Sequence, residues 1–310
     1  MALNYAEVWS PDLLEIMEQE SLTSPFVTTA VKWLSAKTFH FTQMSTSGYK
    51  SHSRLGGWNK GTFAQTDVPF TLTHDRDISF LVDKIDVDET NETASIKKIS
   101  EVFHKTQQIP EMDAYFYSKV ATEAQKLDGY HSSTALSSYT KENVYGKLKA
   151  MLSAGKLRRY VAKGALIAYV NSTIMDLLEQ STDFTRKIEM TQIAEGGIGI
   201  ETRITDIDGV TLIEVIDDER FYDKFDFTDG FAPVASTSHK INVLIASPLT
   251  VKTVPKIASI YYFNPGQHTE GDGYLYQDRS LSDTFVFPNG KDNKIDSIYV
   301  DVDTETYSAA

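Results

Sequence analysis

The sequence contains no cysteine among its 310 residues. Disulfide bonds, thiolate nucleophiles and cysteine-ligated zinc are therefore excluded. No apolar run approaches the roughly 18 residues that a membrane-spanning helix needs. The first residues, Met1–Glu7, lack the basic region and the apolar stretch of a secretory signal. We expect a soluble protein that is made in a cytosol and is not exported by the usual route.

Acidic residues are missing from one long segment, Ser21–Thr66. This segment carries five cations and no anion, whereas the whole chain has a formal charge of −13. The cations are Lys32, Lys37, Lys50, Arg54 and Lys60. So sharp a charge asymmetry between neighbouring segments indicates an arm that interacts with an acidic surface. The most abundant acidic surface available to it is another copy of the same protein.

The remaining composition is that of a globular protein. With 41% hydrophobic and 24% charged residues, the chain is too apolar to be disordered. Its length allows one large domain or two ordinary ones. Nucleic acid is disfavoured as a principal ligand, because phosphate contacts need clustered lysine and arginine and this chain is acidic.

Two alternating segments at the borders of the basic region predict β-strands. Thr38–Thr42 and Pro69–Thr73 alternate apolar and polar residues. Ser45–Gly61 between them is rich in serine and glycine, which favours turns. A hairpin with about 15 residues per arm would reach about 50 Å from its root. Because an isolated hairpin is marginal in water, we expect it to lie on its own domain or, as the charge favours, on a neighbour. A flexible polar surface loop is the alternative.

The centre of the chain predicts two helices. After strand-like residues 78–88, a long helix begins near Asn91 or Thr93, either of which can cap it. Its apolar stripe continues to about Leu127, with a break or kink expected at Pro110. A second helix is expected from Thr140 to Ser153, with an inward-facing stripe. The inward residues are Val144, Leu148 and Met151.

Two later segments have the same strand-then-helix pattern. Ala165–Val170 is an apolar strand followed by Ser172 as a helix cap, and Ile241–Ala246 is followed by Ser247 as cap and Pro248 at the first helical position. Asp208–Gly209 predicts a tight hairpin between residues 202–207 and 210–216. Asn289–Gly290 provides another turn near the C-terminus. The fold class is therefore α+β, with a long hairpin that projects from a mixed core.

The search for catalytic, cofactor and metal sites finds none. The seven histidines have no metal-ligand spacing, and Gly196–Gly199 is followed by β sequence rather than by the helix that a phosphate-binding loop requires. The acidic stretch Glu201–Asp229 is densest at Asp206–Asp208 and at Asp217, Asp218 and Glu219. A solvated turn, pairing with basic residues of another subunit, and calcium binding are three interpretations of this stretch.

Several short motifs, in this order, resemble the major capsid proteins of tailed bacteriophages. Phe80–Asp83, Asp88–Asn91 and Thr106–Tyr115 look like the entry and middle of that family's spine helix. Ile204–Val210 leading into Asp217–Phe221 is similar to the family's hairpin before an acidic-arginine turn, and Ile241–Pro248 is similar to a late strand-helix step. The resemblance covers nearly the whole chain.

This resemblance implies an HK97-like fold with four parts. They are an N-terminal arm at 1–36, an extended β-hairpin loop at 37–77, a peripheral domain with the spine helix at 78–129 and 241–310, and an axial domain at 130–240. A closing β-hairpin is expected near the C-terminus. The implied function is a structural one without catalysis or cofactor, in which hexamers and pentamers form an icosahedral shell around double-stranded phage DNA.

The resemblance also implies partners and a location. The chain would bind other copies of itself, a portal and head-completion proteins, and would enclose DNA without sequence-specific binding and without contact with a membrane. Because fewer than 40 residues precede the loop, we expect a separate scaffolding protein rather than a cleaved scaffolding segment. The protein would lie in the virion capsid, and in the host cytoplasm during assembly.

The contacts between subunits are expected at the basic loop and the acidic turn. The candidate residues are Lys50, Arg54, Trp58, Lys60, Asp217, Asp218 and Glu219. We expect non-covalent contacts, since no partner asparagine can be identified for a cross-link to Lys50 or Lys60. Two other functions are considered: a different self-associating virion component, such as a tail-tube or decoration protein, and a metal-dependent hydrolase that uses the acids of 201–229.

Overall fold

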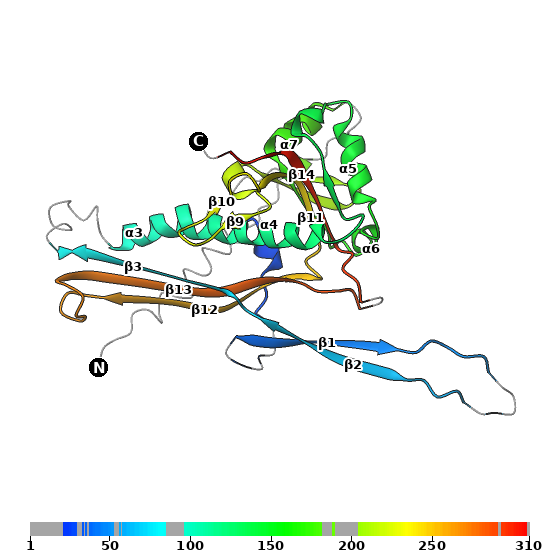
Figure 1. Cartoon of the computed structure of the whole chain (residues 1–310), viewed down its shortest axis with the longest axis horizontal. Coiled ribbons are helices and arrows are strands. Elements are labelled where there is room, and N and C mark those ends of the chain that lie inside the picture. The colour runs from blue at the N-terminus through cyan, green and yellow to red at the C-terminus, as the bar shows by residue number, and fades with distance from the viewer. Residues whose placement is uncertain are drawn as a thin grey trace.

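The protein has a mixed α/β fold in which strands dominate (Figure 1). The computed structural model describes residues 21–29, 33, 35, 37–52, 56, 58–84, 96–181, 188–189, 204–290 and 293–308. Figure 1 shows three parts. The first is a continuous run of helix over residues 96–125, here called the helix line, which lies along a long sheet. The others are a body of helices and strands at one end of that line and a hairpin that projects alone.

The described strands form four sheets. Their bounds are β1 Thr38–Thr46, β2 Phe63–Thr71, β3 His74–Asp83, β4 His131–Ser133, β5 Ile167–Asn171, β6 Ile188–Glu189, β7 Ile204–Ile207, β8 Val210–Val215, β9 Phe225–Asp226, β10 Ala232–Pro233, β11 His239–Ala246, β12 Val251–Phe263, β13 Gly273–Val286 and β14 Ile298–Thr306. The α-helices are α3 Ile96–Phe103, α4 Ile109–Gln125, α5 Val144–Leu152, α6 Arg158–Val161 and α7 Ser172–Gln180.

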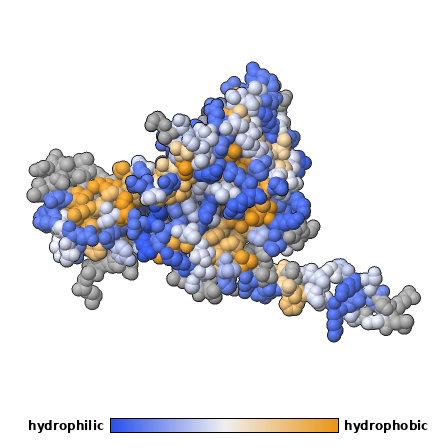
Figure 2. All heavy atoms as spheres, viewed as in Figure 1, coloured by the Kyte–Doolittle hydropathy of each residue, from blue (hydrophilic) through white to orange (hydrophobic). Residues whose placement is uncertain are grey.

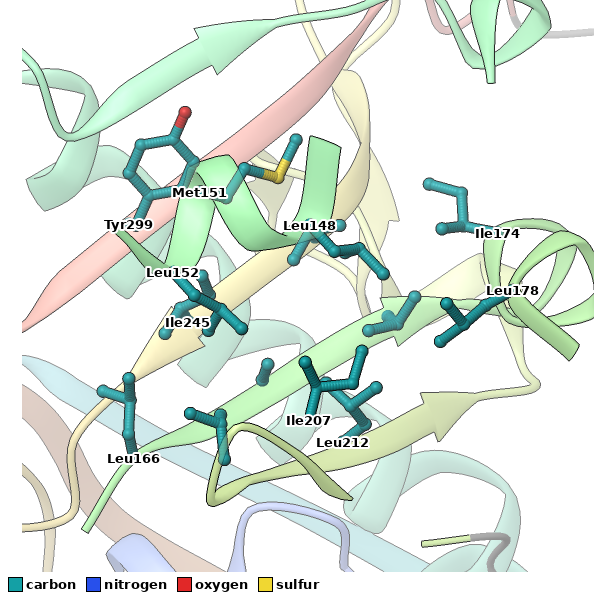
Figure 3. Packing of buried hydrophobic residues seen from close by; sticks show 14 of the residues in the cluster. Leu148, Met151, Leu152, Leu166, Ile174, Leu178, Ile207, Leu212, Ile245 and Tyr299 are labelled. Atoms are coloured by element: carbon teal, nitrogen blue, oxygen red, sulfur yellow. The ribbon is translucent and has the colours of Figure 1, made fainter. Parts of the chain in front are cut away.

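The body is built on a seven-stranded mixed sheet of order β4-β14-β11-β5-β8-β7-β6. Both of its faces are covered, because successive residues of a strand point to opposite faces. On β5, Ala168 and Val170 pack under α5 and α7, whereas Tyr169 between them packs toward α4. Figure 3 shows the first of these two cores, in which the leucines and methionine of α5 lie over the sheet.

The spacing of apolar residues explains how α5 covers that face. Val144, Leu148 and Met151 are buried, as the apolar stripe predicted. Residues at this spacing share one side of a helix. The helix is shorter than the predicted 140–153, because Thr140 and its neighbours form a turn before it begins. The predicted hairpin at Asp208–Gly209 is confirmed, with both residues at positive φ, as the tight turn between β7 and β8 requires.

The second long sheet has three antiparallel strands in the order β12-β13-β3. Exposure alternates along β3, so one face of this sheet is covered and the other faces solvent. The covered face includes Phe80 and Tyr276, and Phe103 of α3 packs edge-on against Phe80 at 5.5 Å between ring centroids. The helix line therefore covers this sheet as well as one face of the seven-stranded sheet.

The helix line does not break at Pro110. Instead, a π-helical turn at His104–Gln108 joins α3 to α4, and the Ile109 N–H donates to the carbonyl oxygen of His104. Pro110 lies in the first turn of α4, where a missing N–H costs little. The irregularity predicted from proline is thus present as a wider turn just before it, and the helix continues. The predicted start at Asn91 or Thr93 lies outside the described residues.

Three local predictions differ from the structure. The cap of α7 is Asn171, whose side chain accepts from the Thr173 N–H, while the predicted cap Ser172 is the first helical residue and donates to Glu214 at 2.7 Å. No helix follows Ser247 and Pro248: the chain makes one turn and enters β12, a segment rich in β-branched residues. The expected C-terminal hairpin is also wrong, because β13 pairs with β12 and β3, whereas β14 pairs with β11 and β4.

The boundary expected between the axial and peripheral domains, at 240/241, does not follow the strand pairing. β11 and β14 belong to the seven-stranded sheet with β5 and β8, and β12 and β13 belong to the three-stranded sheet with β3. The chain therefore passes from one sheet to the other and back within residues 239–306. Long-range pairing of this kind is not visible in the local sequence pattern.

One buried carboxylate connects three segments around α4. Asp113 is fully buried and accepts hydrogen bonds from the hydroxyls of Ser21 (2.6 Å) and Thr23 (2.7 Å). It also pairs with the Arg220 guanidinium at 3.0 Å. Since a buried charge requires such partners, this cluster fixes the N-terminal segment and the 218–220 turn against the helix.

We expect Asp113→Ala to lower the free energy of unfolding by about 3–5 kcal/mol, because Arg220 would lose its buried partner. Lys126→Ala is the control, since it removes an exposed pair with Glu123 that contributes at most about 1 kcal/mol. Urea denaturation measures both. A loss below about 1 kcal/mol for Asp113→Ala would contradict the structural role of the cluster.

Candidate interaction surface

The projecting element is the hairpin of β1 and β2, and it agrees with the prediction from alternating residues. The two strands pair antiparallel from Thr38 opposite Thr71 to Thr46 opposite Phe63. In the part of the chain that the structure describes, no third strand pairs with them. Figure 1 shows the hairpin extending away from the rest of the molecule. A two-stranded ribbon of this kind gains little stability from its own contacts.

The root of the hairpin is held by a cluster of aromatic rings. Phe39 is 1% exposed and packs edge-on against Phe285 at 5.2 Å, and Phe70 packs edge-on against Phe287 at 5.0 Å. Leu72, Val254 and Leu281 complete this cluster. Aromatic pairs in such geometries contribute beyond the area that they bury. The hairpin is therefore fixed at its base to the end of the three-stranded sheet.

An ion-pair bridge supports the same root. The Asp75 carboxylate accepts from Lys37 at 3.0 Å and from Arg279 at 2.9 and 3.0 Å. Hydrogen bonds from Arg279 and then from Lys37 lower the pKa of Asp75 to about 2. Lys37, one of the five cations of the acid-free segment, thus has an acidic partner within its own chain.

The far part of the hairpin, meaning the described residues from Thr46 to Phe63, exposes large aromatic side chains and cations. Tyr49, Trp58 and Phe63 are exposed, with Trp58 94% accessible and Phe63 75% accessible. Lys50 and Lys60 are exposed on opposite arms, and Asn59 links the arms by donating to the Ser51 carbonyl at 2.9 Å. Figure 2 shows blue hydrophilic residues on the projecting hairpin as well as on the body. Arg54 lies outside the described residues. Large exposed aromatic residues beside cations are typical of a surface that binds a partner.

The predicted acidic residues at 217–219 have partners within the chain. Asp217 pairs with Arg220 at 3.1 Å and accepts from the Glu219 N–H. Asp218 pairs with Lys240 and accepts from the Asn171 side chain. Glu219 is exposed. The structure therefore does not bring these acids to the hairpin cations of the same molecule, and two of the three are already neutralised locally.

Other acidic side chains accept hydrogen bonds from residues that are distant in the sequence, so local sequence patterns do not reveal these contacts. Asp283 accepts from Thr73 and from the Tyr115 hydroxyl at 2.8 Å, and Asp301 accepts from Tyr139 and Asn242.

Within the described ranges, no group of three or more histidine or acidic side chains could hold a metal ion. The helices that the structure describes are also too short or too polar to cross a membrane.

Comparison of the structure with solved structures finds similar chains. The mature capsid of bacteriophage PhiM1 matches with a TM-score of 0.62 and 14% identity, over 93% of this chain and 88% of that one. The capsid of cyanophage P-SCSP1u matches with a TM-score of 0.56 and 11% identity, over 90% and 86%. A structure from Mycobacterium phage Ogopogo matches with a TM-score of 0.56 and 7% identity, over 92% of each chain.

The chain has the fold of phage capsid proteins. The resemblance seen in the sequence is thus confirmed at the level of the fold. No family model and no curated protein matches the sequence itself. At 14% identity or less, the arrangement of the elements is retained while most side chains differ. Any contact residue must therefore be argued from this chain.

We expect Phe39→Ala to detach the hairpin root without unfolding the body. Loss of a buried phenylalanine costs about 3–5 kcal/mol, so amide exchange in β1 and β2 should accelerate by about 100-fold or more. Exchange in α4 should not change. Met44→Ala, at an exposed position of the same strand, is the control. Equal acceleration in α4 would show that the hairpin and body unfold together.

A second prediction concerns pH. Because the folded pKa of Asp75 lies below its ordinary value of 3.8, its stabilising effect is present above pH 4 and is lost as the pH falls through 2. Asp75→Asn should therefore accelerate exchange at the hairpin root at pH 6 and have little effect near pH 2. NMR titration of the Asp75 carboxyl provides the direct measurement, and a midpoint near 4 would contradict the ion-pair bridge.

Proposed function

We propose that this protein is a major capsid protein, a structural and non-catalytic component of a phage virion. The observation that carries the proposal is the hairpin, which is anchored firmly at its root and exposes aromatic and cationic side chains at its far part. An isolated chain has nothing to cover that surface among its described residues. The capsid fold supplies the setting in which a neighbour does so.

In the assembled state, copies form hexamers and pentamers of an icosahedral shell around double-stranded DNA. The hairpin lies over a neighbouring subunit, and Lys50, Arg54, Trp58 and Lys60 make the contact. Of the predicted acids, Glu219 is the most exposed residue, whereas Asp217 and Asp218 are partly exposed and pair within their own chain. Many modest contacts per subunit then add up to a stable shell.

The charge of the chain fits this role. A net charge of −13 disfavours adhesion of packaged DNA to the inner wall, so the protein encloses DNA without binding a particular sequence. No cofactor takes part. A scaffolding protein, a portal and head-completion proteins are the further partners that we propose, first in the host cytoplasm and finally in the virion.

The sheets provide a basis for the domain division. We assign the seven-stranded sheet with α5, α6 and α7 to the axial domain, and the three-stranded sheet with α3 and α4 to the peripheral domain. The extended loop is then the β1–β2 hairpin, preceded by the N-terminal arm. This division keeps β11 and β14 with the strands to which they are hydrogen-bonded.

Negative-stain electron microscopy of the purified protein at high concentration tests the proposal. Closed shells or hexameric capsomers are expected. Tubes or small rings would instead indicate a tail component, and a monodisperse monomer would require repetition with co-expressed scaffolding protein. Persistent monomers under both conditions would contradict a capsid function.

We expect Lys50→Glu, Arg54→Glu and Lys60→Glu together to abolish shell formation, because the hairpin would then repel an acidic neighbour. Arg54→Glu alone should only lower the yield, since one exposed ion pair contributes about 0–1 kcal/mol. Reversal of Lys141, Lys163 and Lys224, which are exposed on the body, gives the same change in net charge. Shells are counted by electron microscopy, and normal yield from the hairpin triple variant would refute the hairpin contact.

A further inference from the structure

The hairpin leaves the three-stranded sheet at a two-residue corner, Leu72 and Thr73, between the end of β2 and the start of β3 (Figure 1). The Leu72 N–H donates to the Lys37 carbonyl oxygen at 2.9 Å, so the ribbon closes at this corner. A few residues at the end of an element are where a rigid element can change its direction. The contacts of Thr73 therefore bear directly on where the hairpin points.

The other contacts at the root fix the position of the hairpin more firmly than its direction. Burial of the aromatic cluster is favourable but non-directional. The ion-pair bridge of Lys37, Asp75 and Arg279 is partly exposed, and exposed pairs contribute modestly. Hydrogen bonds to a buried carboxylate are both directional and stronger. One such carboxylate lies at the corner.

This carboxylate is Asp283 of β13, which is 1% exposed. Its Oδ2 accepts from the N–H and the hydroxyl of Thr73, at 2.9 and 2.8 Å. Its Oδ1 accepts from the Tyr115 hydroxyl of α4 and from the Thr284 N–H, both at 2.8 Å. Lys119, also on α4, adds a cation 3.9 Å from Oδ1. One oxygen thus holds the hairpin corner and the other holds the helix, and the two cannot move independently.

The Tyr115 ring is held on two sides. His74, the first residue after the corner, stacks on it with ring centroids 3.9 Å apart, and Phe227 packs edge-on at 5.3 Å. Burial and then the nearby Arg76 lower the pKa of His74 to about 4, so this ring is neutral at pH 7. Burial and the adjacent Asp283 raise the pKa of the Tyr115 hydroxyl well above its ordinary value, so it remains a donor. The hydroxyl therefore stays aimed at Asp283.

We propose that Asp283 is a positioning residue through which α4 sets the direction of the hairpin. The body packs on the same turn of α4, because Phe116 and Tyr117 follow Tyr115 directly and are buried against the body. Hairpin and body thus take their orientation from one stretch of helix. The inference concerns the single chain and does not depend on the proposed function. In a chain that assembles through its hairpin, a displacement of α4 would change the direction in which the hairpin is offered.

The distance between two spin labels tests this inference. Because the chain has no cysteine, Ser51→Cys on the hairpin and Ala150→Cys on α5 provide two unique labelling sites, and both residues are exposed. Labelled chains are diluted with unlabelled chains, so that only distances within one chain contribute. Double electron–electron resonance of this parent should give one narrow distance distribution.

Tyr115→Phe removes the hydroxyl that joins α4 to Asp283 and should broaden or shift this distribution. The matched control is Tyr139→Phe, because the Tyr139 hydroxyl donates to the buried Asp301 at 2.6 Å within the body. The control should keep the parental distribution, and circular dichroism checks that both variants fold. A parental distribution for Tyr115→Phe, or equal broadening by the control, would overturn the inference and leave the capsid function in place.

A double variant tests whether the helix and the corner act through the same carboxylate. Thr73→Val removes the hydroxyl contact to the other oxygen of Asp283. Contacts that act through one group are not additive. Tyr115→Phe combined with Thr73→Val should therefore give a distribution no broader than that of the broader single variant. Broadening that adds up would show that the two contacts act independently, which contradicts the proposed link.

Amide exchange provides a second readout at the corner itself. The Thr73 N–H donates to Asp283, so its exchange in Tyr115→Phe should accelerate about 10-fold. The Phe287 N–H, which donates to the Thr250 carbonyl oxygen at 2.8 Å in the same root, should keep its parental rate. Equal acceleration at both amides would indicate that the whole root loosens, and an unchanged Thr73 rate would show no link to α4. Either result would count against Asp283 as the positioning residue.

Discussion

The contact that the rest of the structure depends on is the packing of α4 between two sheets. Phe116 and Tyr117 of this helix are buried against Tyr169 and Phe221 of the body. Tyr115, one residue earlier, donates to Asp283 on β13 of the other sheet. A helix presents consecutive residues about 100° apart, so neighbouring positions reach different partners. The relative position of body and long sheet is therefore set by one short stretch of α4.

The position of the hairpin depends on this packing of α4. Its root packs on the residues that end β13, so a rigid α4 and a rigid sheet also determine where the hairpin starts. Beyond the root, ladder hydrogen bonds continue but the apolar side chains lose their cover. The same ribbon is thus held by its own chain at one end and exposes its aromatic side chains at the other. Under the proposed function, such an element keeps its direction before assembly and gains contacts during it.

The sequence correctly predicted those elements that depend on residues close together along the chain. Alternation at Thr38–Thr42, the stripe of α5 and the Asp208–Gly209 turn were sufficient for their structures. It failed where a distant partner decides: β14 joined the body rather than β13, and Ser247 was followed by β12 because β13 was available to pair. The residues that we propose as contacts, Lys50, Trp58 and Lys60, were selected from charge and composition. The buried Asp113 cluster could not be predicted in this way, since its partners Ser21 and Arg220 are distant in the sequence.

Net charge alone overstates how much acidic surface this chain offers to a basic partner. Asp113, Asp283 and Asp301 are counted in the −13, yet each is buried with donors from its own chain. Asp217 and Asp218 are likewise satisfied locally. The acid-free segment therefore cannot be attracted to the acids as a group. Its specificity must come from those carboxylates that folding leaves exposed to a neighbour.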